Sequence, residues 1–205
     1  MTQLSSVLGD LALLGIVLSC ALGVTITLLA LATRRMPAAR LAGLGTAGLV
    51  GLYAVVLFVV SIASREVVLP AGAEKSVSGF DPHLHFRVTA PAARGADGLV
   101  RVTVRVRSDA KRALQDPRYI QVRLLDARGR GFDPVSEAGG PQAGVVFPRT
   151  LEPGEGYEVT LAFRPTPAAA GLRLWVDETG FPFALTIGNE NSPLHRRTLL
   201  ALEGV

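Results

Sequence analysis

The chain has very few residues that could support thiol or soft-metal chemistry. Its 205 residues include one cysteine, Cys20, and two methionines, Met1 and Met36. All three precede residue 65, so the segment 65–205 contains neither sulfur-bearing side chain. This absence excludes disulfides, thiolate metal sites, thiol nucleophiles and CxxC redox pairs from that segment. Its stability must therefore come from apolar burial and backbone hydrogen bonding.

Charge is also absent from two long stretches near the start of the chain. Residues 11–33 and 41–64 contain no Asp, Glu, Lys, Arg or His. A helix rises about 1.5 Å per residue, so each stretch is long enough to cross a hydrocarbon core of about 30 Å. The sequence therefore predicts an α-helical transmembrane hairpin over 11–64, with spans at 11–33 and 41–64 and a loop at 34–40.

The distribution of arginine predicts the orientation of this hairpin. Loop 34–40 carries three arginines and no acid, whereas the tail 1–10 has no basic residue. Because basic loops are retained in the cytoplasm, we expect both the short tail 1–10 and the segment 65–205 outside the cytoplasmic membrane of a bacterium. The tail also lacks the basic region of a signal peptide. Residues 17–20 loosely resemble a lipoprotein signal, but the chain stays apolar after Cys20, which favours a cysteine within a span.

Small residues recur at intervals of four in both spans, which places them on one face of each helix. The two sets are Gly15, Ser19 and Gly23 in the first span, and Gly43, Ala47 and Gly51 in the second. We expect these faces to pack against each other within the hairpin. The alternative is that one of them docks onto another membrane protein.

Alternation of apolar and polar residues dominates the segment 65–205. It is clearest in 99–107, where four valines alternate with arginine and threonine. This period places alternate side chains on opposite faces of a strand. Similar patterns and short apolar runs predict strands near residues 67–69, 84–88, 119–124, 145–147, 157–163, 172–177, 183–187 and 198–202. Many half-buried strands with short Gly and Pro turns predict an all-β antiparallel sandwich over 65–205.

The turn chemistry resembles that of a known group of proteins. A valine-rich strand is followed by Leu-Leu-Asp at 124–126, by Leu-Glu-Pro-Gly-Glu at 151–155, and by a strand that ends in Phe163-Arg164-Pro165. This order is similar to that of the exported bacterial immunoglobulin-like domains, many of which are tethered to a membrane and largely uncharacterised. The resemblance covers residues 99–187. It implies an immunoglobulin-like fold outside the cytoplasm and carries over no catalytic residues.

Charge and motifs exclude several classes of function. The chain has 21 Lys and Arg against 17 Asp and Glu, and three of the arginines lie in loop 34–40. The rest of the chain is thus nearly balanced, with arginines scattered singly along strands, which does not indicate nucleic-acid binding. The sequence contains no Gly-x-Ser-x-Gly, zinc-protease or phosphate-loop motif, so we expect no enzymatic activity.

Two histidines form the most suggestive candidate site. If a strand begins at His83, the imidazoles of His83 and His85 share one face, about 7 Å apart. Imidazole is a common metal ligand, and Asp81 could act as a third ligand or as a supporting partner. The pattern therefore predicts a possible copper or zinc site at Asp81, His83 and His85. The alternative interpretation is a pair of solvated histidines on a polar strand face.

Trp175 and a short basic cluster are candidate contact residues. Trp175 alternates with Leu174 and Val176, so it falls on the polar face of its strand, where it could anchor a partner, lie at the membrane interface or be covered by a loop. His195, Arg196 and Arg197 could face lipid headgroups or form a solvated start to the last strand.

Together these features favour a non-enzymatic, membrane-anchored extracytoplasmic binding protein. Its partners would be the lipid bilayer and a membrane or envelope protein, and it could be an accessory subunit of a membrane complex. The alternative function is envelope metal binding or metal delivery by His83 and His85.

Overall fold

The computed structural model describes residues 2–77, 83–136, 146–178 and 182–204 of the chain. These residues form two compact units. One unit contains residues 1–65 together with 180–196, and the other contains 66–179 together with 197–205. The chain therefore passes three times from one unit to the other, and each unit is described by itself below.

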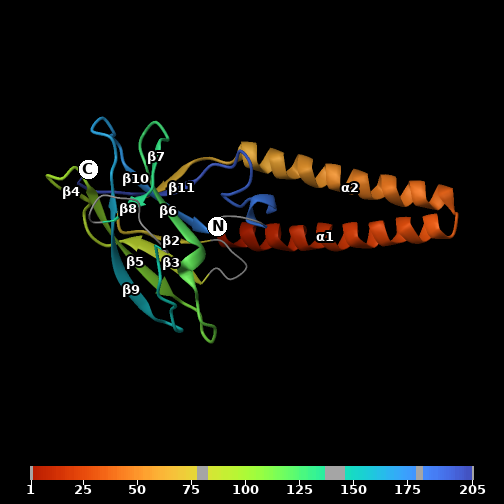
Figure 1. Ribbon diagram of the computed structural model, residues 1–205, viewed down its shortest axis with the longest axis horizontal. Coiled ribbons are helices and arrows are strands. Elements are labelled where there is room, and N and C mark those ends of the chain that lie inside the picture. Colours follow the sequence, from red (N-terminus) through yellow and green to blue (C-terminus); the bar gives the residue numbers. More distant parts are fainter. Residues whose placement is uncertain (1, 78–82, 137–145, 179–181, 205) are drawn as a thin grey trace. The chain divides into compact units, whose positions relative to one another are not determined.

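The first unit is built on two long helices, α1 (Thr2–Ala32) and α2 (Met36–Ala63), that pack against each other (Figure 1). Both are rich in leucine, alanine and valine. Their threonines bond back to the helix: the hydroxyls of Thr25, Thr27 and Thr46 donate to the carbonyls four residues earlier, at 2.8, 2.7 and 2.9 Å. These bonds satisfy the hydroxyls without any solvent.

The connection between the helices is shorter than the expected loop at 34–40. It comprises only 33–35, because α2 begins at Met36. Pro37 lies in the first turn of α2, where its missing N–H is not needed for helical bonding. Arg34 takes a left-handed φ of 57°, and the amide of Arg35 donates to the carbonyl of Ala30 at 2.8 Å, which closes the end of α1.

The helical unit also includes the segment 182–196. This segment contains one short 3₁₀ helix, η2 (Phe183–Leu185), followed by a series of turns. The expectation of a strand at 183–187 is therefore wrong. Four apolar residues within five suggested a strand, but the amide of Thr186 donates to the carbonyl of Phe183 at 3.0 Å, which is turn bonding.

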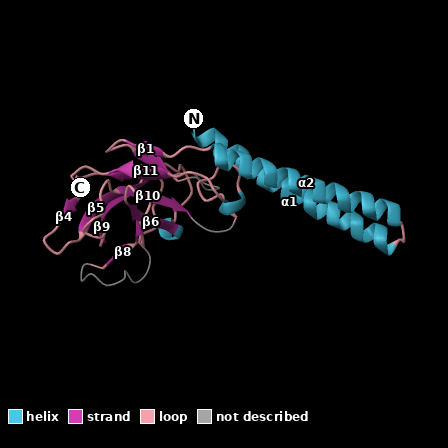
Figure 2. Cartoon of the chain, turned by 90° about the horizontal axis from the view of Figure 1, so that it is seen from above, coloured by secondary structure: helices cyan, strands magenta, loops and turns pink. Residues whose placement is uncertain are grey.

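The second unit is a β-sandwich of two sheets (Figure 2). The first sheet has the order β1 (Val67–Leu69), β11 (Thr198–Ala201), β10 (Arg173–Glu178), β6 (Ile120–Leu125), β7 (Gly131–Phe132). The second has the order β2 (Glu74–Ser76), β3 (Leu84–Val88), β5 (Val100–Ser108), β9 (Gly156–Phe163), β8 (Pro134–Val135), with β4 (Ala93–Arg94) paired to β5. A 3₁₀ helix, η1 (Pro117–Tyr119), precedes β6.

The expected sandwich is thus present, with one departure from a wholly antiparallel arrangement. Strands β1 and β11 pair in parallel, with Val68 opposite Leu199. The other strand pairs are antiparallel among the described residues. The local turns follow the sequence: Gly129 and Gly154 adopt φ values of 77° and 78° at the reversals where left-handed backbone is needed.

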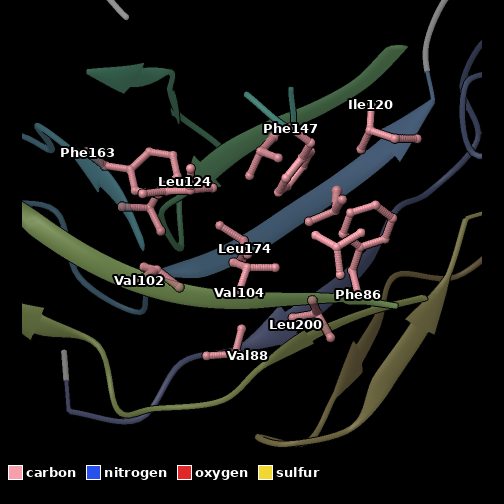
Figure 3. Close-up of a cluster of buried hydrophobic side chains, with 14 of the residues drawn as sticks. Phe86, Val88, Val102, Val104, Ile120, Leu124, Phe147, Phe163, Leu174 and Leu200 are labelled. Carbon is pink, nitrogen blue, oxygen red and sulfur yellow. The ribbon is translucent and has the colours of Figure 1, made fainter. Parts of the chain in front are cut away.

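The hydrophobic core lies between the two sheets (Figure 3). The four valines of β5 at 100, 102, 104 and 106 are fully buried, as their alternation predicts. Leu124, Leu174 and Leu200 face them from the first sheet. Phe147 packs against Phe86 with ring centroids 5.2 Å apart. Of the strand expected at 145–147, residue 145 lies outside the described residues, and Phe147 fills the core without joining a sheet.

Truncation of this core should strongly destabilise the sandwich. Phe86→Ala removes a fully buried ring and should lower the free energy of unfolding by about 3–5 kcal/mol, through lost transfer energy and the cavity left behind. Unfolding of the full chain in detergent can be followed with denaturant through the single tryptophan, Trp175. The matched control is Leu114→Ala at a residue that is 67% exposed. Equal effects of the two changes would contradict the assigned core.

Candidate functional site

The histidines predicted as a site meet on a carboxylate that the sequence analysis did not identify. His83 immediately precedes β3, His85 lies within it, and Asp109 immediately follows β5, the antiparallel neighbour of β3. The backbone amide of Asp109 donates to the carbonyl of His83 at 3.1 Å, which fixes the two chain segments side by side. The missed signal was the strand register, since pairing Leu84 with Ser108 places residue 109 beside residue 83.

The side chains of this cluster form a short polar network. His83 Nδ1 lies 2.6 Å from Asp109 Oδ1, and a carboxylate can only accept, so this ring nitrogen carries the proton. His85 Nε2 lies 2.8 Å from Asp109 Oδ2, at an angle poorly aligned for a hydrogen bond. On its other side, His85 Nδ1 lies 3.0 Å from the hydroxyl of Ser76 on β2. Asp109 therefore bridges one exposed and one buried imidazole.

Charge around the cluster favours ionised carboxylates. Burial of Asp109 raises the pKa of its carboxyl, but the interactions with His83 and His85 outweigh this effect and hold the pKa below its ordinary value. The hydrogen bond from Arg107 at 3.0 Å likewise lowers the pKa of Glu74, and the charge of His85 adds to that effect.

The hydroxyl of Ser76, the imidazole of His85 and the carboxylate of Asp109 follow one another in the order of a hydrolase triad. However, the amide expected to bind the oxyanion in such a site is already hydrogen-bonded elsewhere. A nucleophilic serine needs nearby amide donors for the oxyanion, and the residue after the nucleophile often supplies one. The amide of Val77, which follows Ser76, donates to the carbonyl of Leu84 at 3.1 Å as part of the strand pairing. The Ser76 hydroxyl is therefore better described as a support for the His85 ring.

Metal binding at this site stays a prediction. Asp81, the proposed third ligand, lies outside the described residues. Within the described parts of the chain, no group of three His, Cys, Asp or Glu side chains is arranged to hold a metal ion. A metal bound by His83 and His85 would have to displace their contacts with Asp109 or use Asp109 itself as the third ligand.

Trp175 is buried rather than exposed. It does lie on the outer face of its sheet, opposite Leu174 and Val176, but only 4% of it is accessible. It forms a small second cluster with Leu125 and Leu199, and the guanidinium of Arg197 lies 4.8 Å from its ring centroid. Stacking on the ring gives Arg197 a cation–π contact, so one of the three basic residues at 195–197 belongs to the sandwich surface.

The small residues of the two helices have different surroundings. A Cβ on Gly23 would lie 2.0 Å from Thr46 Oγ1, so Gly23 allows the close approach of α1 and α2. Gly43 and Gly51 have no atom within 4 Å of such a Cβ, so their side of α2 is open. The two predicted faces therefore do not pack against each other along their whole length, because Gly23 meets Thr46 and not a member of the set at 43, 47 and 51.

Gly15 and Ser19 contribute to a cavity instead. It has a volume of about 240 Å³ and is almost wholly apolar. Its walls come from both helices and from the segment 182–196, and they comprise Ala12, Gly15, Ile16, Ser19, Leu49, Leu52, Tyr53, Val56 and Ile187.

Comparisons with known proteins give only distant matches. No protein-family model matches the chain, and neither does any curated protein. Among solved structures, the secreted protein MPT63 of Mycobacterium tuberculosis has 15% sequence identity and a TM-score of 0.43, over 68% of this chain and 99% of that one. An uncharacterised β-sandwich protein from Clostridium difficile has 6% identity and a TM-score of 0.37, over 68% and 96%. A DUF1425 family member from Shewanella has 20% identity and a TM-score of 0.31, over 53% and 92%. Likeness at this level assigns neither a family nor a function.

The Asp109 cluster should make the stability of the sandwich depend on acid pH. A carboxyl whose pKa is lower in the folded state stabilises that state above its unfolded pKa of about 3.9, and this contribution is lost as pH falls through the folded value. Asp109→Asn should therefore reduce the loss of stability between neutral pH and pH about 3. The measurement is the denaturant midpoint of the full chain at several pH values.

Two comparisons make this test specific. His83→Gln should reduce the same acid dependence, because it removes the hydrogen bond that lowers the Asp109 pKa. Asp133→Asn, which removes an exposed carboxylate beside Arg123, is the control. An acid dependence that Asp109→Asn and Asp133→Asn change to the same extent would contradict the role of the cluster.

Proposed function

We propose that α1 and α2 form a membrane hairpin that anchors the β-sandwich outside the cytoplasm. The observation that carries this proposal is the exposure of apolar side chains over both helices. The two helices are long and apolar enough to span a membrane, at Leu8–Ala32 and Met36–Ala63. Only 6% and 11% of their most apolar windows are buried. Such a surface is unstable in water and is the expected surface of helices in lipid.

Internal bonding of the threonines in the same helices also supports a lipid environment. The threonine hydroxyls bond to carbonyls of their own helix, and the connection at 33–35 carries Arg34 and Arg35 at the polar end of the hairpin. With Arg40 close by, these arginines favour a cytoplasmic connection, so the sandwich would be extracytoplasmic.

Cysteine labelling tests this topology directly. In a Cys20→Ala background the chain has no thiol, so a new cysteine reports one position. A membrane-impermeant maleimide added to intact spheroplasts should label Arg112→Cys in the sandwich, and should label Ala38→Cys near the helix connection only after permeabilisation. Both positions are exposed. The reverse pattern, or labelling of both sites without permeabilisation, would contradict the proposed topology.

We further propose that the protein is a non-enzymatic accessory subunit with an immunoglobulin-like binding domain. One span would be enough for a tether, whereas the hairpin presents an open small-residue face on the side of α2 where Gly43 and Gly51 lie. In membranes such faces allow close approach of a second helix. The network around Ser76 supports the non-enzymatic interpretation, since the amide of Val77, the residue that follows Ser76, is already bonded to the carbonyl of Leu84.

Leucine substitutions on that face should disrupt the partnership. Gly43→Leu combined with Gly51→Leu fills the open face and should reduce co-purification of a partner in mild detergent by about tenfold, if close helix packing contributes about 1.4 kcal/mol. The matched control is Val59→Leu at an exposed position of α2. Recovery of the unmodified chain as a monodisperse monomer with no bound protein, after crosslinking in native membranes, would contradict the accessory role.

A further inference from the structure

We infer that the segment 182–196 is an interfacial membrane segment, which inserts into the outer leaflet beside the helices and contacts lipid through Leu185 and Leu194. The inference rests on the proposed membrane hairpin. It adds a third membrane-contacting element, drawn from the middle of the sandwich sequence between β10 and β11.

The first support is the set of contacts that hold this segment on the helices. The hydroxyl of Tyr53 donates to the carbonyl of Leu185 at 2.6 Å. At the other end of the segment, the amide of Arg196 donates to the hydroxyl of Ser64 at 2.7 Å, directly after α2 ends. Between them, the carbonyl oxygen of Ile187 lies only 2.1 Å from the position that a Cβ on Gly9 would occupy, so the segment lies directly against the backbone of α1. These contacts involve both helices.

The second support is the depth that these contacts imply. Tyr53 and Ser64 are eleven residues apart, which corresponds to about 16 Å along a helix axis. The segment therefore extends from the end of α2 to a level well inside its apolar stretch. Ile187 agrees with this depth, because it lines the apolar cavity together with Ile16, Tyr53 and Val56, while its carbonyl lies beside Gly9 near the start of the α1 span.

The third support is the internal bonding of the segment. Non-helical backbone is tolerated at membrane depth only where its polar groups are bonded within the protein. The carbonyl of Thr186 accepts from the Ser192 hydroxyl and from the amide of Asn189, and the amide of Asn191 donates to the Asn189 side chain at 2.8 Å. With the Tyr53 bond to Leu185, these contacts bond part of the backbone of the segment within the protein.

The fourth support is the pair of apolar side chains that remain outside. Leu185 is 42% exposed and Leu194 is 64% exposed, although the segment is otherwise rich in turns and polar residues. Leu194 also takes a left-handed φ of 67°, which is uncommon for a residue other than glycine. His195 and Arg196 follow it, so an apolar side chain lies next to basic groups. This combination suits the boundary between acyl chains and anionic headgroups.

Depth-dependent fluorescence quenching tests the inference on the full chain. A nitrobenzoxadiazole label is attached to a single cysteine in the Cys20→Ala background, and the protein is reconstituted in phosphatidylcholine–phosphatidylglycerol vesicles that contain spin-labelled lipids. Leu194→Cys should show a blue-shifted emission and a greater loss of fluorescence with spin labels near the headgroup than with labels deep in the acyl chain.

Two reference positions separate failure of this inference from failure of the proposed anchor. Leu22→Cys, at an exposed residue of α1, should be quenched most by the deep spin label, and Leu114→Cys, at an exposed residue of the sandwich, should not be quenched. Quenching at Leu22 without quenching at Leu194 would overturn the interfacial segment alone. Absence of quenching at Leu22 would overturn the membrane hairpin and the inference with it. Emission from Trp175 verifies that each labelled variant is folded.

Discussion

The apolar surface of α1 and α2 sets the physical constraint on the rest of the protein. Leucine, valine and isoleucine side chains remain exposed along both helices, and an aqueous environment would penalise each of them. In lipid the same surface costs nothing, but every backbone and hydroxyl group must then find a partner within the protein. The helical bonding and the hydroxyls of Thr25, Thr27 and Thr46 meet much of that requirement in the hairpin, although the buried hydroxyl of Ser61 has no hydrogen-bond partner among the described residues. The proposed interfacial segment bonds part of its backbone through its own turns and through Tyr53.

The chain order explains the parallel pairing of β1 with β11. Strand β1 follows Ser64 after two residues, and β11 follows Arg196 after one. Because the amide of Arg196 is bonded to the Ser64 hydroxyl, the two strands begin from neighbouring points of the helical unit. Both then run in the same direction, with the amide of Val67 donating to the carbonyl of Arg197 at 3.2 Å. This shared starting point is compatible with the parallel pairing that the structure shows.

Periodicity in the sequence was sufficient to predict the parts of the fold that repeat. The valines of β5 and the alternation in β3, β6, β9 and β10 are local signals, so they identify strands without knowledge of their neighbours. The segment 183–187 misled the same reasoning, because an apolar run of that length is compatible with a strand or a turn against helices. Its environment is set by Tyr53 and Gly9, which are more than a hundred residues away.

The candidate site shows the same division between local and non-local information. The common face of His83 and His85 follows from strand periodicity, but their partner Asp109 depends on how β3 pairs with β5. The burial of Trp175 depends on Leu125 and Leu199 on two other strands, and on Arg197. The alternation within one strand shows on which face of the sheet such a residue lies, but it contains no information on which other residues cover that face.

Strand register, rather than stability, is the main contribution of the polar contacts in a domain without disulfides. Exposed ion pairs such as Asp97–Arg101 contribute little to stability, whereas a buried phenylalanine contributes much more. A slip of one residue between β3 and β5, however, would turn the valines of β5 outward and bring arginine and threonine into the core. It would also separate Asp109 from both imidazoles. Apolar burial therefore supplies the stability of the sandwich, and the Asp109 cluster adds a penalty to the wrong register at the end of the longest strand.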